Sequence, residues 1–230
     1  MATATYNHYR EQLETYFDRT ARDAWAQLTS DAPVSRIRET VRAGRDEMRA
    51  TLLSWLPQDL TGKRILDAGC GTGAVAVEMA KRGAHVIAVD VSAGLVDIAR
   101  ERAPKGLDID WQSGDMLDVA LGSFDHVIAM DSLIHYPFGD IIGALTELGE
   151  RTTGSMIFTV APRTPALTVM HTVGLLFPRG DRAPAIQPAT IAKLQRRISE
   201  TPAMLGWQHG RDERISAGFY KSHALELIWK

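Results

Sequence analysis

Residues 63–73 read KRILDAGCGTG, and this stretch decides the fold. It starts as a short apolar strand, passes through three alternate glycines and enters a helical pattern that begins at Ala74. Glycines at a strand-to-helix turn let the backbone bend tightly and approach a ligand closely, and the helix N-terminus lies just beyond. The stretch therefore predicts a strand–turn–helix unit with a nucleotide-like ligand at the end of the strand.

The spacing of the glycines indicates the charge of that ligand. A dinucleotide such as NAD uses the spacing G-x-G-x-x-G, and a carboxylate at the strand end would repel its phosphates. Here the spacing is G-x-G-x-G, and Asp67 precedes it. An acid suits a cationic ligand such as S-adenosylmethionine, with its ammonium and sulfonium groups. The motif resembles the first signature of class I methyltransferases, which implies cofactor contacts at Asp67, Gly69, Cys70, Gly71 and Gly73.

Downstream of Pro57, short β-branched runs alternate with helical patterns. The runs span residues 64–67, 85–90, 108–111, 124–130 and 155–160, and the helical patterns span residues 74–82, 92–103 and 140–151. Such alternation predicts an α/β fold, a parallel sheet with helices on both faces. Two final runs, 207–214 and 219–229, predict an antiparallel hairpin that completes a seven-stranded, mostly parallel, Rossmann-like sheet of the class I methyltransferase type.

The remaining segments surround this sheet. Residues 1–56 are predicted to form an N-terminal helical arm, with two amphipathic helices that break near Pro33. Residues 57–230 are predicted to form the methyltransferase domain. Within that domain, residues 162–187 are an apolar insert interrupted by prolines, followed by a helix over 188–199. We expect the insert to bind substrate and the arm to close over the ligands as a lid.

Composition excludes several classes of protein. Of the 230 residues, 45% are hydrophobic and 23% charged, which is ordinary usage for a compact globular chain. A net charge of -2 without a basic block argues against a nucleic-acid partner. Cys70 is the single cysteine, so it cannot form an internal disulfide, and one cysteine is too few for a thiolate zinc site. We therefore expect a reducing compartment, the cytoplasm, and no protein-bound metal.

Two segments bear on membranes. The first residues carry polar and charged groups where an export signal would need an apolar core. Residues 165–178 are apolar but too short to cross a bilayer, although they could touch one.

Two further acids follow predicted strands. Asp90 ends the second strand, where an acidic side chain can accept hydrogen bonds from both ribose hydroxyls. The alternative role of Asp90 is to cap the N-terminus of the helix that begins near Ser92. Asp115 lies just past the third strand, where this fold places an acid near the adenine amino group and an apolar neighbour against the adenine ring. The alternative is that Asp115 only stabilises the Ser-Gly-Asp turn. The apolar cofactor contacts predicted beside these strand ends are Val91, Met116 and Met130.

The fourth strand ends in MDSLIHYP, residues 130–137, at the sheet edge where ligands bind in doubly wound folds. Methyltransferases that act on adenine or glutamine amino groups usually carry an acid or Asn, two prolines and an aromatic residue here, and this chain does not. Cytosine C5 methyltransferases need a cysteine nucleophile, and Cys70 already belongs to the glycine loop. Both differences argue against a nucleic-acid substrate.

A closer resemblance comes from six segments taken together. They are YF at 16–17 with Trp25, IRETVRAGR at 37–45, DAGCG at 67–71, SLIHYP at 132–137, APRT at 161–164 and GLLFP at 174–178. This set resembles the magnesium-protoporphyrin IX O-methyltransferase family of chlorophyll and bacteriochlorophyll biosynthesis. The resemblance covers most of the chain, and LIHYP combined with GLLFP is more specific than the glycine loop.

The resemblance implies transfer of a methyl group from S-adenosylmethionine to one propionate carboxylate of Mg-protoporphyrin IX. The products are the monomethyl ester and S-adenosylhomocysteine. A propionate has a pKa of about 4.5, so it is already ionised at neutral pH and needs no strong base. The reaction needs positioning of the two reacting groups in a dry site. The family also suggests handover from the porphyrin-binding large subunit of magnesium chelatase and a peripheral place at the photosynthetic membrane.

His135 is the first candidate for a substrate-facing, catalytic residue. The imidazole could hydrogen-bond the substrate carboxylate or serve as a ligand to the chelated Mg²⁺. The alternative to a substrate role is that His135 only packs at the strand end. Tyr136 beside it, and His171 and Phe177 on the insert, are further substrate candidates. Arg163 and Arg179 bracket the insert and could clamp propionates, although a lone Arg is more often solvated.

The arm supplies the remaining candidates. Trp25 is expected to face the porphyrin, and Arg38 or Arg42 the cofactor. Relatives often carry a tyrosine four residues after the tryptophan, and this chain has Thr29 there, so a catalytic tyrosine cannot be assigned to that position. Tyr16 is the possible substitute.

Three alternatives stay open at this point. An O-methyltransferase for another apolar acid or phenol, such as a quinone precursor, would suit the same insert and His135. A membrane- or partner-binding protein with a structural S-adenosylmethionine would use residues 165–178 as a surface element. An NAD-dependent oxidoreductase is disfavoured by Asp67 and the glycine spacing.

Overall fold

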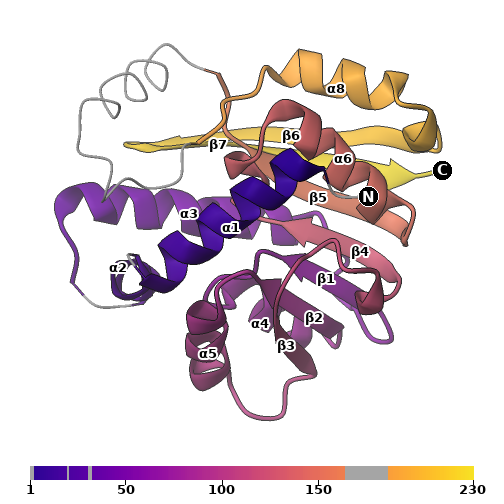
Figure 1. Cartoon of the computed structure of the whole chain (residues 1–230). Coiled ribbons are helices and arrows are strands. Elements are labelled where there is room, and N and C mark those ends of the chain that lie inside the picture. The colour runs from indigo at the N-terminus through magenta and orange to yellow at the C-terminus, as the bar shows by residue number, and fades with distance from the viewer. Residues whose placement is uncertain (1–2, 20, 31–32, 164–185) are drawn as a thin grey trace.

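The computed structural model describes residues 3–19, 21–30, 33–163 and 186–230 (Figure 1). The strands are β1 (Arg64–Ala68), β2 (His85–Asp90), β3 (Ile109–Ser113), β4 (Phe124–Ala129), β5 (Thr152–Val160), β6 (Trp207–Ala217) and β7 (Tyr220–Trp229). The helices are α1 (Ala4–Arg19), α2 (Arg22–Leu28), α3 (Arg36–Ser54), α4 (Ala74–Lys81), α5 (Ala93–Arg102), α6 (Phe138–Gly149) and α8 (Ile191–Glu200). A short 3-10 turn, η2, spans Leu133–His135.

The strands of the described residues form one seven-stranded sheet in the order β3-β2-β1-β4-β5-β7-β6. The five strands from β1 to β5 pair in parallel, and β7 inserts antiparallel between β5 and β6. This arrangement confirms the predicted mostly parallel sheet with a terminal antiparallel hairpin. Because β1 is central and its neighbours all run in its direction, their carboxyl ends meet at one edge, where doubly wound folds bind ligands.

The core fills both faces of the sheet. Successive residues of a strand point to opposite faces, so Leu66 joins the cluster under α1, α6 and α8, while Ile65 joins the cluster under α3 and α4. Figure 1 shows α1 crossing the sheet from the side of α6 towards α2. Strands covered on both faces read as continuous apolar runs, which is why the sequence predicted them well.

The described residues of the arm form three helices, where the sequence predicted two. The break at Ala21 separates α1 from α2, and the Ala21 N–H donates to the Tyr16 carbonyl at 2.9 Å. A bond back to the fifth preceding residue is a helix-ending geometry, because it satisfies a carbonyl that the helix leaves unpaired. The break lets α1 lie along the domain while Trp25 in α2 reaches the glycine loop, since its Nε1 stands 3.6 Å from an ideal Cβ on Gly71.

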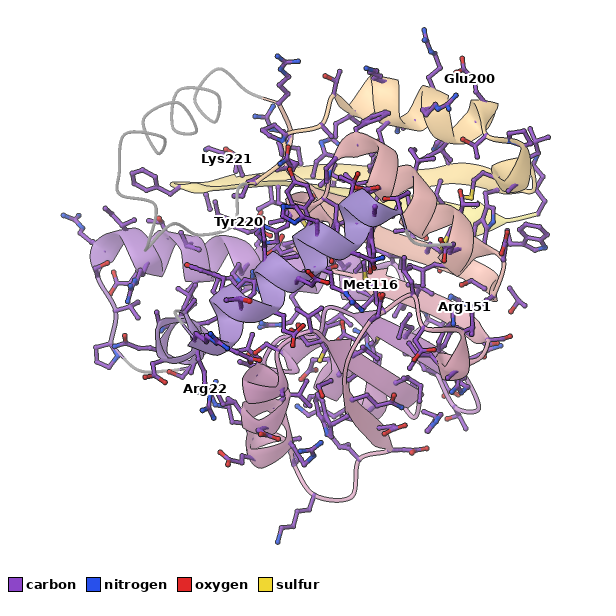
Figure 2. The ribbon with its side chains drawn as sticks, in the orientation of Figure 1. Arg22, Met116, Arg151, Glu200, Tyr220 and Lys221 are labelled. Atoms are coloured by element: carbon purple, nitrogen blue, oxygen red, sulfur yellow. The ribbon has the colours of Figure 1, made fainter. Side chains whose placement is uncertain are left out.

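The last arm helix, α3, packs as a core element. Met48 and Leu52 are fully buried against the sheet. Gly44 permits close approach to the terminal hairpin, because a Cβ there would lie 2.6 Å from the Tyr220 ring. Figure 2 shows Tyr220 and Lys221 on β7 near α3. Among the residues described, no helix is long and apolar enough to cross a bilayer.

Candidate active site

The glycine loop joins β1 to α4 with three left-handed residues. Gly69, Gly71 and Gly73 have φ values of 84°, 53° and 82°, in the region that other residues rarely adopt. A Cβ on Gly69 would lie 2.4 Å from Ser132 Cβ, and one on Gly73 would lie 2.4 Å from the Trp111 ring. The loop therefore needs glycine for both conformation and space, and its backbone is held close to the end of β4.

Asp67 is a buried acid at the end of β1. Its side chain belongs to a residue that is 1% exposed, and its Oδ2 has no hydrogen-bond partner within the described residues. Burial raises the pKa of Asp67 to about 7, against a hydrogen bond from the Ala76 backbone that lowers it. Ser132 Oγ, on the neighbouring strand end, is likewise buried without a partner in the described chain. Unsatisfied buried oxygens at a cavity wall are the groups that a bound polar ligand would satisfy.

Asp90 organises the glycine loop from the end of β2. Its Oδ2 accepts from the Gly71 N–H at 2.8 Å and its Oδ1 accepts from the Ser92 N–H at 2.9 Å. Burial raises the pKa of this carboxyl, and the two backbone donors partly offset that effect. The helix cap is Ser92, whose Oγ accepts from the Leu95 N–H at 3.1 Å. The carboxylate of Asp90 is thus placed beside the loop for ribose contact, which stays a prediction.

Asp115 contacts the arm. Its Oδ1 accepts from the Tyr6 hydroxyl at 2.6 Å, and its Oδ2 pairs with Arg10 at 3.2 Å. Tyr6 also stacks on Tyr136, with ring centroids 4.7 Å apart. Burial raises the pKa of the Tyr6 hydroxyl, so it stays a donor at neutral pH. The structure therefore joins α1 to the predicted adenine corner, and the adenine contact of Asp115 stays a prediction.

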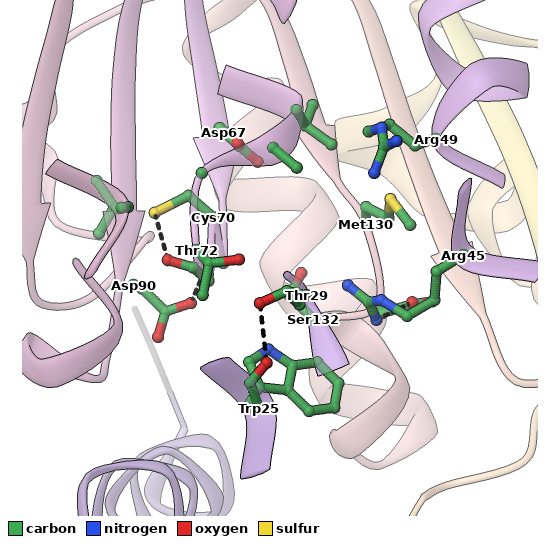
Figure 3. A pocket seen from close by; sticks show the side chains of 18 of the residues that line it. Trp25, Thr29, Arg45, Arg49, Asp67, Cys70, Thr72, Asp90, Met130 and Ser132 are labelled. Atoms are coloured by element: carbon green, nitrogen blue, oxygen red, sulfur yellow. Dashed lines mark hydrogen bonds and ion pairs between the residues drawn. The ribbon is translucent and has the colours of Figure 1, made fainter. Parts of the chain in front are cut away.

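A cavity of about 470 Å³ lies over the glycine loop (Figure 3), within the usual size range of small-molecule sites. The predicted cofactor residues that line it are Asp67, Gly69, Cys70, Gly71, Gly73, Asp90, Val91, Met116, Met130 and Arg42. Arg38 and Asp115 do not line it. Arg38 is exposed on α3, and Arg42 donates to the Leu28 carbonyl at 2.9 Å. We call this space the cofactor cavity.

A second cavity of about 270 Å³ adjoins the first, with a mostly apolar wall. Tyr16, Ile134, Ile186 and Phe219 contribute to that wall. We call it the apolar cavity. The two cavities share the lining residues Phe17, Trp25, Arg45, Asp131 and His135. These five residues form the junction, the place where groups held in the two cavities would meet.

His135 lies at the junction, as the predicted substrate-facing role requires. It ends the short turn η2, and the ring of Phe17 meets it edge-on with centroids 6.1 Å apart. Tyr136 follows it and lines the cofactor cavity. Tyr16 lines the apolar cavity, and partial burial raises the pKa of its hydroxyl. The structure brings these candidates together, and their individual roles stay predictions.

Of the candidates on the insert, Arg163 lies within the described residues. Arg163 is exposed, lines neither cavity, and donates its backbone N–H to the Ala189 carbonyl at 3.0 Å. His171, Phe177 and Arg179 lie outside the described residues.

Sequence reasoning missed Arg45 and Asp131. Asp131 lies two residues after the end of β4, while Asp67 is the penultimate residue of β1 and Asp90 the last residue of β2. The position of Asp131 near a strand's carboxyl end was therefore an available signal. Arg45 Nη1 donates to Asp131 Oδ2 at 2.5 Å, and its guanidinium carbon lies 4.8 Å from the Trp25 ring centroid. No spacing rule links the two residues, because they meet only through the packing of α3 against the sheet edge.

The cysteine and the acids do not form a metal site in the part of the chain that is described. Burial raises the pKa of the Cys70 thiol well above its ordinary value, so it stays protonated. Its Sγ faces the Gly71 carbonyl at 3.8 Å. Across the described ranges, no three His, Cys, Asp or Glu side chains are placed to hold an ion.

Comparisons with known proteins decide the family. The model described as "Magnesium-protoporphyrin IX methyltransferase C-terminus" matches residues 129–229, and a general methyltransferase-domain model matches residues 65–152. A magnesium-protoporphyrin O-methyltransferase of Rhodobacter capsulatus is 50% identical over 224 residues, which cover 96% of this chain and 97% of the relative. The chain belongs to the magnesium-protoporphyrin O-methyltransferase family.

Two further relatives in the magnesium-protoporphyrin O-methyltransferase family share less sequence with this chain. The chloroplastic protein of Arabidopsis thaliana is 28% identical over 226 residues, 95% of this chain and 71% of the relative. A crystal structure of the Synechocystis protein with bound SAH matches with a TM-score of 0.83 at 27% identity, covering 96% of this chain and 100% of that chain. This match confirms the predicted class I methyltransferase fold.

One group of relatives corresponds to an alternative substrate. A ubiquinone biosynthesis O-methyltransferase of Xanthomonas oryzae is 36% identical over 146 residues, 58% of this chain and 61% of the relative. The similarity therefore spans a smaller part of the chain than it does for the magnesium-protoporphyrin O-methyltransferase family.

Proposed function

We propose that this chain transfers a methyl group from S-adenosylmethionine to one propionate carboxylate of Mg-protoporphyrin IX, giving the monomethyl ester and S-adenosylhomocysteine. The observation that carries the proposal is the junction, where the cofactor cavity over the glycine loop and the mostly apolar cavity share their lining residues. These are Phe17, Trp25, Arg45, Asp131 and His135. The Rhodobacter relative, similar over nearly the whole chain, supports the choice of substrate.

The residues of the cofactor cavity fit S-adenosylmethionine. The unsatisfied Oδ2 of Asp67 would accept a hydrogen bond from the ammonium group, and the carboxylate of Asp90 beside the glycine loop would accept from the ribose hydroxyls. When bound, S-adenosylmethionine supplies an electrophilic methyl group on a sulfonium centre. The propionate is already ionised, so no side chain has to remove a proton. The protein's task is to hold the carboxylate in line with the methyl group and to keep water out.

The assay that tests this proposal uses purified protein, labelled S-adenosylmethionine and Mg-protoporphyrin IX. Metal-free protoporphyrin and a ubiquinone-type phenol are the comparison acceptors. We expect ester formation that is at least about tenfold faster with the Mg-loaded porphyrin, because an axial ligand or the ring geometry set by the metal orients the macrocycle. Turnover of the phenol without turnover of the porphyrin would instead assign the quinone-precursor reaction.

The N-terminal arm is proposed to be a lid over the cofactor. Its contacts fall on cofactor-side segments: Tyr6 and Arg10 bind Asp115, and Asp18 accepts from Ser92 Oγ at 2.5 Å and from the Gly94 N–H at 3.1 Å. On this proposal a ligand leaves the cavity when these contacts open, so the contacts slow its release.

Tyr6→Phe tests the lid, because it removes the hydroxyl bond to Asp115 and keeps the ring that stacks on Tyr136. We expect S-adenosylhomocysteine to dissociate about five- to tenfold faster, since a hydrogen bond to a charged group is lost. Stopped-flow dissociation measures this rate, and Tyr9→Phe on the same helix is the control. An unchanged rate in Tyr6→Phe would refute the lid role of this contact.

Two associations remain predictions. Handover from the porphyrin-binding large subunit of magnesium chelatase would show as a changed methylation rate when that subunit is added. Contact of residues 165–178 with the photosynthetic membrane would show as co-flotation with liposomes that is lost when this segment is made polar.

We propose that the only magnesium in the reaction is the ion chelated by the porphyrin.

A further inference from the structure

We propose that Arg45 binds the propionate carboxylate that becomes methylated, and that Asp131 is the positioning residue that sets the orientation of its guanidinium. The inference rests on the proposed function and names the anion-binding group of the same site.

The location of Arg45 distinguishes it from its neighbours on α3. Arg42, Arg45 and Arg49 all line the cofactor cavity. Of these three, Arg45 also lines the apolar cavity. Figure 3 shows Arg45 and Arg49 reaching into the pocket from α3. A carboxylate that enters from the apolar side therefore meets Arg45 before the other two arginines.

Two contacts hold the Arg45 guanidinium in place. Its Nη1 donates to Asp131 Oδ2 at 2.5 Å, and its carbon lies over the Trp25 ring at 4.8 Å. The side chain is 19% exposed. A guanidinium has five N–H donors in a rigid fork. Within the described residues, Asp131 is the one hydrogen-bond acceptor of Arg45, so the other side of the fork can receive a second carboxylate in bidentate geometry.

Asp131 is itself fixed on all sides. Its carboxylate accepts from the Tyr220 hydroxyl at 3.0 and 3.1 Å, from Ser222 Oγ at 3.3 Å and from Thr159 Oγ1 at 3.2 Å. Its backbone N–H donates to Thr159 Oγ1 at 2.7 Å. Burial raises the pKa of Tyr220, which keeps its hydroxyl a donor.

The backbone of Asp131 points to the same conclusion. Its φ of 55° is the one positive φ outside glycine among the residues described. A left-handed residue that is not glycine persists when its surroundings hold it there, and such residues gather at functional sites. The conformation turns the carboxylate towards α3 and the hairpin, where it orders Arg45 without entering the cavity as a free anion. A substrate anion then meets the guanidinium at the junction.

The charge changes of the reaction predict which kinetic constant depends on Arg45. A carboxylate oxygen forms a bond to the methyl carbon, the carbon–sulfur bond breaks, and its electron pair stays on sulfur. The carboxylate and the sulfonium lose their charges together, and no proton moves. The attraction between Arg45 and the carboxylate is therefore strongest before the reaction and weaker in the transition state, so Arg45 contributes mainly to substrate binding.

The test compares Arg45→Gln with Arg36→Gln, a matched change on the same helix at an exposed residue that lines neither cavity. We expect Arg45→Gln to raise the KM for Mg-protoporphyrin about ten- to a hundredfold, with kcat within about threefold. Arg36→Gln is expected to leave that KM within about twofold. Binding of S-adenosylhomocysteine by calorimetry verifies that both variants are folded, and Arg45→Lys provides a second, charge-preserving variant.

A ligand without carboxylates completes the design. Mg-protoporphyrin dimethyl ester is used as a competitive inhibitor, and its Ki is expected to be the same in wild type and Arg45→Gln. Asp131→Asn is expected to raise the KM for the diacid about three- to tenfold and to leave the Ki of the diester unchanged, whereas a merely structural role would raise both.

The outcomes separate the two proposals. Equal rises in the KM for the diacid and the Ki of the diester would overturn the assignment of Arg45. So would an equal KM increase in Arg36→Gln, or a rise confined to the KM for S-adenosylmethionine. Absence of any ester with the wild-type protein would refute the proposed function itself.

Discussion

Asp67→Asn is expected to weaken binding of S-adenosylmethionine about ten- to a hundredfold while stabilising the cofactor-free protein. The Asp67 carboxyl is buried and its Oδ2 has no partner within the described residues. An ammonium group would satisfy that oxygen, so asparagine loses a charge-assisted hydrogen bond in the complex. Without cofactor, asparagine removes an uncompensated buried charge, and we expect the free energy of unfolding at pH 8 to rise by about 1–3 kcal/mol.

The pH dependence follows from the pKa of Asp67. Burial raises this pKa from 3.8 to about 7 in the folded, cofactor-free protein. The folded state thus binds this proton more tightly than the unfolded state does. Asp67 therefore contributes most to the stability of the folded state below pH 3.8. This contribution declines as the pH rises and is fully lost above about pH 7.

Cofactor binding has the opposite dependence, because only the ionised carboxylate attracts the ammonium. We expect the affinity for S-adenosylmethionine to rise between pH 6 and pH 8 by about tenfold, and to be nearly flat in Asp67→Asn. Calorimetric titrations at several pH values measure the affinity, and denaturant unfolding measures the stability. A wild-type affinity that is equally flat, or a less stable Asp67→Asn protein at pH 8, would contradict this account.

His135→Ala is expected to lower kcat/KM for Mg-protoporphyrin by about a hundredfold, because a misplaced carboxylate loses its near-attack geometry. His135 lines both cavities at the junction and lies against Phe17. Steady-state kinetics with both substrates varied measures the loss. Binding of S-adenosylhomocysteine serves as the control for folding, and its Kd should change by less than about threefold.

A second comparison separates the two roles proposed for His135. If the imidazole hydrogen-bonds the carboxylate, His135→Gln retains a donor and should recover about tenfold of the activity lost in His135→Ala. If it is an axial ligand to the chelated Mg²⁺, the Soret band of bound Mg-protoporphyrin should shift in both variants, and binding of metal-free protoporphyrin should be unaffected. Full activity of His135→Ala would exclude both roles.

The local part of the site could be predicted from the sequence. The residues 63–73 combine a buried strand, an acid and three alternate glycines, and each property depends on neighbours in the chain. The observed φ values of Gly69, Gly71 and Gly73 have the sign that such a turn requires. The alternating strands and helices could be predicted for the same reason, because the spacing of apolar residues within a short segment indicates its secondary structure and its buried face. The family resemblance also came from segments that can be read along the chain.

The arm shows where sequence reasoning stopped. Amphipathic periodicity predicted helices in residues 7–56 but not the break at Ala21, because that break depends on where α1 and α2 pack. In the same way, Asp115 was interpreted as an adenine contact from its place after β3. Only the tertiary structure placed Tyr6 and Arg10 on its carboxylate, more than a hundred residues away in the chain.

The sequence by itself determined the sheet, the glycine loop and the acids at the strand ends, because these depend on local backbone geometry and on apolar patterns with short periods. The tertiary structure decided the junction between the two cavities. Arg45 in α3 and Asp131 just after β4 are 86 residues apart, and Tyr220 in β7 is 89 residues from Asp131. Their contacts arise from the burial of α3 and β7 at one sheet edge, and a buried charge pair forms only where packing brings both charges together.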